Sequence, residues 1–78
     1  MTIKSIEDDS GLHCVDVMHH PDGTFSFKVF RKDPEDEGRW TLVGDYSGLR
    51  FQNENDALRD AAAKVPWLTD AITPGRTR

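Results

Sequence analysis

Four side chains that could bind zinc lie within eight positions near the start of the chain. They are His13, Cys14, His19 and His20. Imidazole and thiolate are common protein ligands of Zn²⁺. In an extended chain each residue advances by about 3.3 Å, so Cys14 and His20 would be about 20 Å apart. Only a sharp bend at 18–21 would bring these ligands together, and we therefore expect no metal site.

Cys14 would also be a candidate nucleophile if a base lay within hydrogen-bond distance and the surroundings lowered its thiol pKa. His13 is its neighbour in the sequence, but adjacent residues of a strand point to opposite faces. We therefore expect Cys14 to be a small, half-buried side chain without a catalytic role.

The acidic run 33–37 carries four carboxylates, which are ligands that Ca²⁺ prefers. The run lacks the alternating acidic pattern and the distant glutamate of a calcium-binding loop, so we interpret it as a solvated connection between strands. The sequence contains no phosphate-binding glycine loop, no G-x-S-x-G and no H-E-x-x-H. These absences predict that the protein is not an enzyme and holds no cofactor.

Large apolar side chains are the best candidates for contacts with another protein. The candidate interaction residues are Phe30, Val43, Trp67 and Leu68. Phe30 and Val43 are predicted to lie on the face of a sheet that a helix leaves uncovered. Tryptophan is enriched at protein interfaces, although Trp67 has an alternative interpretation as a core residue. We expect Trp40 to belong to the core.

These residues belong to three predicted strands, 13–19, 24–31 and 39–46, in which apolar and polar side chains alternate. The sequence Pro-Asp-Gly at 21–23 predicts a tight turn, because Asp-Gly readily adopts positive φ. Residues 49–51 could add a short fourth strand. Connections this short require antiparallel neighbours, since parallel strands need long crossovers.

The alternation also predicts which side chains face the core. On the second strand these are Phe25, Phe27 and Val29. On the third strand, Trp40, Leu42, Gly44 and Tyr46 share one face by the same rule. Gly44 has no side chain to pack, which indicates a bulge or a close crossing of the helix.

A single helix is predicted between Asn53 and Pro66. Asn53 is a preferred N-cap residue. An apolar stripe follows, formed by Leu58, Ala61, Ala62 and Val65. Pro66 ends the helix, because the residue before a proline avoids helical geometry.

Together these elements predict an α+β fold, in which a three-stranded antiparallel meander, or a four-stranded one with the short extra strand, is packed on one face by a single C-terminal helix. The domain is predicted to cover 13–68, between flexible tails at 1–12 and 69–78 that are poor in apolar residues. The order of elements is similar in topology to the arm-type DNA-binding modules of tyrosine recombinases. The resemblance is one of topology and not of residue motifs, and topology alone is a weak basis for function.

The chain has 78 residues, of which 36% are hydrophobic and 31% are charged, which predicts one small domain with a thin core. Oligomerisation commonly compensates for such a core. Cys14 is the only cysteine, which excludes an intrachain disulfide and favours a reducing compartment. The first residues lack the apolar run of a signal peptide, and no segment reaches the roughly 18 apolar residues that span a bilayer. We therefore expect a cytoplasmic protein that does not bind a membrane.

The net charge of −4 does not favour phosphate binding, because proteins that bind nucleic acid usually present a basic surface. Within 24–52, five acidic residues balance the five basic ones, which are Lys28, Arg31, Lys32, Arg39 and Arg50. Two functions remain open. The first is a non-enzymatic protein-interaction or self-associating module, whose partner is another protein or a second copy. The alternative is a nucleic-acid-binding module that uses these five basic side chains.

Overall fold

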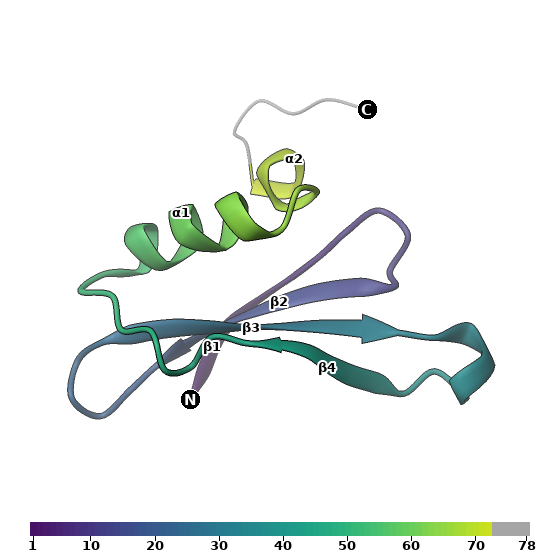
Figure 1. Ribbon diagram of the computed structural model, residues 1–78, viewed down its shortest axis with the longest axis horizontal. Coiled ribbons are helices and arrows are strands. Elements are labelled where there is room, and N and C mark those ends of the chain that lie inside the picture. Colours follow the sequence, from purple (N-terminus) through teal and green to yellow (C-terminus); the bar gives the residue numbers. More distant parts are fainter. Residues whose placement is uncertain (73–78) are drawn as a thin grey trace.

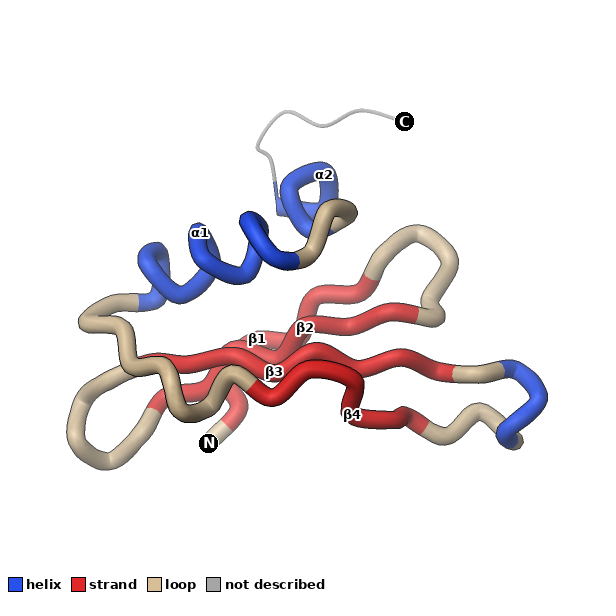
Figure 2. Tube along the Cα trace, viewed as in Figure 1, coloured by secondary structure: helices blue, strands red, loops and turns tan. Residues whose placement is uncertain are grey.

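The computed structural model describes residues 1–72, which form two layers (Figure 1). One layer is an antiparallel sheet with the strands in sequence order: β1 (Thr2–Glu7), β2 (His13–His19), β3 (Phe25–Lys32) and β4 (Trp40–Asp45). The other layer contains α1 (Glu54–Lys64) and α2 (Leu68–Ile72), and a 3₁₀ turn lies at Pro34–Asp36. Figure 2 shows both helices on the same side of the strands. The predicted α+β class, with an antiparallel meander packed on one face by helix, is confirmed.

The N-terminal residues include an edge strand, where a flexible tail was expected over 1–12. β1 pairs antiparallel with β2, and its Ile6 side chain packs against the core. The ammonium group of Lys4 lies 2.7 Å from the carboxylate of Glu54 at the start of α1. The pairing register shifts after Thr2, so the apolar residues of β1 do not alternate. The period that identifies a strand is therefore missing from this part of the sequence.

The C-terminal part contains two helices, where a single helix was predicted. The chain breaks at Pro66 and then forms α2, which contacts β1. Leu68, the first residue of α2, is fully buried. Of the tail expected over 69–78, residues 69–72 belong to α2, and residues 73–78 lie outside the described part of the chain.

The connection from β4 to α1 pairs with the sheet at Phe51. The short fourth strand expected over 49–51 is reduced to a single bridge between Phe51 and Phe25. Asn53 caps α1 as predicted, because its side-chain oxygen accepts a hydrogen bond of 2.8 Å from the backbone amide of Asp56.

The core lies between α1, α2 and the middle of the sheet. Its buried cluster consists of Val15, Phe27, Ala61, Val65 and Leu68. The Phe27 ring stacks on that of Tyr46 with 4.8 Å between the ring centroids. Ala61 of α1 is fully buried in this cluster, and its small side chain lets the helix approach Phe27 and Val15 closely. Phe27 therefore faces the helices, as predicted, and is fully buried between the two layers.

A β-bulge in β4 changes which residues face the helices. Val29 pairs with Gly44, but the next residue, Phe30, pairs with Leu42, so Val43 is an additional residue in β4. The prediction that Trp40, Leu42, Gly44 and Tyr46 share one face is therefore wrong. Gly44 and Tyr46 face α1, whereas Trp40 and Leu42, which precede the bulge, lie on the outer face. By the outer face we mean the face of the sheet turned away from α1 and α2.

Candidate interaction surface

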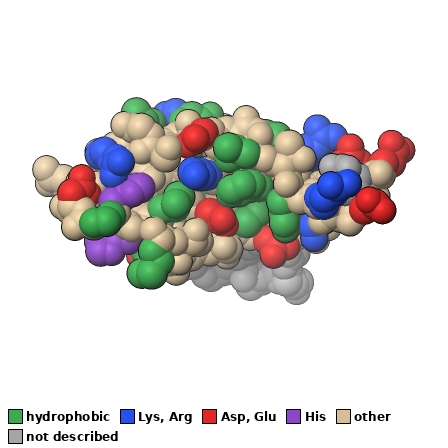
Figure 3. Space-filling model, turned by 90° about the horizontal axis from the view of Figure 1, so that it is seen from below, with side chains coloured by type: hydrophobic (Ala, Val, Ile, Leu, Met, Phe, Trp, Pro, Cys, Tyr) green, Lys and Arg blue, Asp and Glu red, His purple; other side chains and the backbone are tan. Residues whose placement is uncertain are grey.

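The outer face carries a group of exposed apolar side chains. Trp40 is 40% exposed and Leu42 is 45% exposed, and Val43, the bulge residue next to Leu42, is 56% exposed. Leu42 lies directly opposite Phe30 in the β3–β4 ladder. Figure 3 views the molecule from this side and shows hydrophobic side chains across the middle of the face. No element within residues 1–72 lies over them.

Charged side chains border this apolar group in the neighbouring rows of the sheet. Lys28 pairs with Asp16 on one side and with Asp45 on the other. Lys32 pairs with Trp40, and its ammonium nitrogen lies 4.6 Å from the centroid of the indole ring. A cation over an aromatic face is attracted by the ring quadrupole, so Lys32 helps to hold Trp40 in place. The outer face therefore presents an apolar centre bordered by charged side chains that pair with their neighbours on adjacent strands.

A shallow hollow of about 280 Å³ opens beside Trp40. It is lined by Ser5, Glu7, Cys14, Asp16, Phe30 and Trp40. The Ser5 hydroxyl donates to Asp16 Oδ1 at 2.7 Å, and the Cys14 thiol donates to the same oxygen at 3.3 Å. Burial, together with the Asp16 carboxylate, raises the pKa of Cys14 to about 12. The thiol is therefore protonated at neutral pH and is a poor nucleophile.

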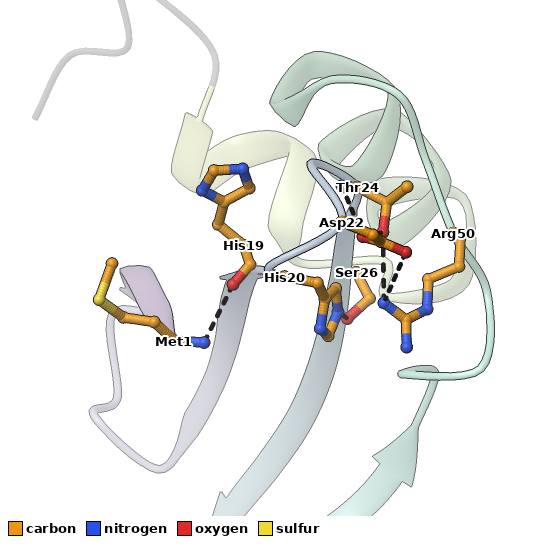
Figure 4. Close-up of polar contacts among 7 residues, drawn as sticks. All are labelled: Met1, His19, His20, Asp22, Thr24, Ser26 and Arg50. Carbon is orange, nitrogen blue, oxygen red and sulfur yellow. Dashed lines mark hydrogen bonds and ion pairs between the residues drawn. The ribbon is translucent and has the colours of Figure 1, made fainter.

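A second polar cluster joins the β2–β3 turn to the loop before α1 (Figure 4). His20 Nε2 and Ser26 Oγ lie 2.6 Å apart. Arg50 Nη1 donates to Thr24 Oγ1 at 3.2 Å and lies 3.9 Å from the Asp22 carboxylate. Sequence reasoning missed this cluster, because the pairing of positions 20 and 26 depends on the exact geometry of the turn.

The cluster has the side chains of a serine–histidine pair but not the access that catalysis needs. Ser26 is fully buried, so its hydroxyl cannot reach a substrate. Partial burial and then the positive charge of Arg50 lower the pKa of His20. The ring is therefore neutral at pH 7, and the pair serves to satisfy a buried hydroxyl.

The other histidines make separate contacts. His13 Nδ1 lies 2.7 Å from an oxygen of Asp8, whereas the His19 ring stacks on Phe25 at the far end of β2, with centroids 4.5 Å apart. Within residues 1–72, no group of three His, Cys, Asp or Glu side chains is arranged to hold a metal ion. No helix in this part of the chain is long and apolar enough to cross a membrane.

Of the four predicted interaction residues, Phe30 lies on the outer face, beside Trp40 and Leu42, which sequence reasoning had placed in the core. Val43 is the exposed residue of the bulge next to Leu42. Leu68 is a core residue and not a surface one. Trp67 packs against the core and lies beside His13, with 6.3 Å between the ring centroids. The sequence offered one signal that Trp40 and Leu42 belong to the outer face. Gly44 indicated a bulge, but the sequence did not fix the position of that bulge.

The five predicted nucleic-acid contacts do not form one surface. Lys28 and Lys32 lie on the outer face, while Arg31 alternates onto the opposite face beside His13. Arg39 lies in the β3–β4 hairpin, where its guanidinium is 3.4 Å from the carboxylate of Glu37. The fifth residue, Arg50, is at the other end of the molecule in the β2–β3 turn cluster. The basic side chains are therefore spread over both faces and both ends of the sheet.

Neither a family model, nor a curated protein, nor a solved structure matches this chain.

Proposed function

We propose that the protein is a small non-enzymatic module that binds another protein chain through the outer face of its sheet. The observation that carries the proposal is the group of half-exposed apolar side chains at the centre of this face, beside Phe30. Contiguous apolar surface on a small protein is typical of interaction sites. Trp40, held by Lys32, supplies the kind of rigid aromatic side chain that dominates binding energy at interfaces.

The chemistry of the polar side chains supports a binding role more than a catalytic one. The Cys14 thiol is protonated at neutral pH, and the Ser26 hydroxyl is inaccessible. The scatter of the basic side chains favours a protein partner over nucleic acid, which needs a continuous basic surface. The lone cysteine favours the reducing environment of the cytoplasm.

Site-specific photo-crosslinking in the organism's own cells tests the proposal. A benzoylphenylalanine replaces Val43, the exposed bulge residue next to Leu42, or, as a matched control, Arg59 on α1, whose side chain is 80% exposed. We expect protein adducts from position 43 and few from position 59. Equal yields from the two positions, or adducts from position 59 alone, would contradict the proposal.

A further inference from the structure

We propose that the chain bound on the outer face is a second copy of this protein, related by a two-fold axis that runs between β3 and β4 and parallel to them. This inference rests on the proposed function, because it names the occupant of the same surface. It is carried by the pattern of side chains across the two strands.

Three cross-strand pairs on the outer face each join side chains of complementary chemistry. Lys28 lies opposite Asp45, Phe30 lies opposite Leu42, and Lys32 lies opposite Trp40. The first pair combines opposite charges, the second combines two apolar side chains, and the third combines a cation with an aromatic ring. In each pair, one member is on β3 and the other on β4.

A rotation by 180° about this axis places a second sheet over the outer face of the first. β3 of the second copy then lies over β4 of the first, and β4 of the second copy lies over β3 of the first. Each side chain then faces the partner of its own pair, now from the other copy. Lys28 faces Asp45 of the second copy and not another lysine, and Phe30 faces the second Leu42. The surface is thus self-complementary in charge and in polarity, which a symmetric dimer requires of its interface.

The geometry of sheet packing fits this arrangement. Facing sheets pack about 10 Å apart with their strands within about 30° of each other, so the apolar centres of the two copies would meet. Val43, the additional residue of the bulge and 56% exposed, would be covered together with Leu42. A contact only two strands wide lies at the small end of interface sizes, so we expect a weak, concentration-dependent dimer.

Pairing of two β4 edges into one continuous sheet is the other symmetric arrangement open to this strand. The bulge at Val43 interrupts the regular row of backbone groups along β4, and bulges of this kind oppose edge-to-edge pairing. Face-to-face packing needs no regular edge. The structure therefore favours the outer face over the β4 edge as the contact between copies.

Sedimentation velocity of the full chain, from low micromolar to millimolar concentration, tests the dimer. The variants are Lys28→Glu, Asp45→Lys and the double exchange of both. Each single reversal sets like charges against each other across the interface, so we expect association to weaken at least about tenfold. The double exchange restores opposite charges, and we expect association within about threefold of the wild type.

The control is Arg59→Glu on α1, which reverses an exposed charge away from the outer face, and we expect it to leave association unchanged. Because Lys28 and Asp45 are also neighbours within one chain, the thermal unfolding of each variant is followed to show that it is folded. A wild type that is monomeric at every concentration would overturn the dimer. So would a dimer that both single reversals leave intact, or one that the double exchange fails to restore. If the wild type is monomeric but position 43 still crosslinks to another protein, the proposed function stands without the second copy.

Discussion

At the scale of single residues, two leucines have opposite environments. Leu68 is fully buried beside Phe27 in the core, whereas Leu42 is 45% exposed on the outer face. The loss of stability caused by the same substitution at the two positions therefore distinguishes a core residue from a residue of the proposed interaction surface.

We expect Leu68→Ala to lower the free energy of unfolding by about 2–5 kcal/mol, because it leaves a cavity in a packed core. Leu42→Ala removes a side chain that is already half in water, and we expect a change below about 1 kcal/mol. Urea unfolding of both variants measures the difference. A loss of similar size at both positions would show that the outer face is needed for folding.

His20 predicts a pH dependence of stability. Its pKa is lowered in the folded state, so the unfolded chain takes up the proton at higher pH than the folded chain does. As pH falls from about 7 to about 5, the unfolded state binds more protons at this site, and stability is lost. His20→Gln keeps a hydrogen-bonding partner for Ser26 but does not titrate.

We expect the unfolding midpoint of the wild type to fall more steeply over this pH range than that of His20→Gln. Comparing the two proteins isolates the contribution of His20 from that of the other groups in the chain. Parallel curves for the two proteins would show that His20 is not the group responsible.

At the scale of elements, the bulge of β4 determines the character of the outer face. Past the bulge, a side chain at Gly44 would point toward α1, and a Cβ atom there would lie 2.9 Å from the Tyr46 ring. That ring is packed against Phe27 and cannot move freely. A glycine is therefore required where β4 returns to the core side of the sheet.

We expect Gly44→Ala to destabilise the fold by about 1–3 kcal/mol through overpacking against Tyr46. Gly48→Ala is the matched control, because a Cβ atom at Gly48 meets nothing within 4 Å. Thermal unfolding compares the two variants. If both alanines are tolerated equally, Tyr46 is free to move and the bulge does not depend on glycine.

The elements also show what the sequence alone could predict. Regular alternation identified β2 and β3, and Asn53 and Pro66 marked the ends of α1. β1 was missed, and the faces of β4 were misassigned, for the same physical reason. An irregularity in pairing shifts the two-residue period, and its position depends on the neighbouring strand and not on local sequence. Trp40 and Leu42 were consequently assigned to the core.

At the scale of the whole molecule, one face of a thin sheet is covered by helix, and the other is left with an apolar centre. Among the described residues, the small core lies on the helix side of the sheet, where Phe27 and Leu68 are fully buried. The apolar side chains on the outer face add little to that core. We infer that they serve contact with another chain, and the charges around them define which chain fits.

The most direct test combines Leu42→Lys with the crosslinker at position 43. The lysine places a charge beside Phe30 at the centre of the outer face, but it touches nothing in the core. The account predicts that Leu42→Lys stays folded, with a loss of stability below about 1 kcal/mol, and that its adducts fall to the yield seen from position 59. A variant that is folded and crosslinks as well as the wild type would contradict it.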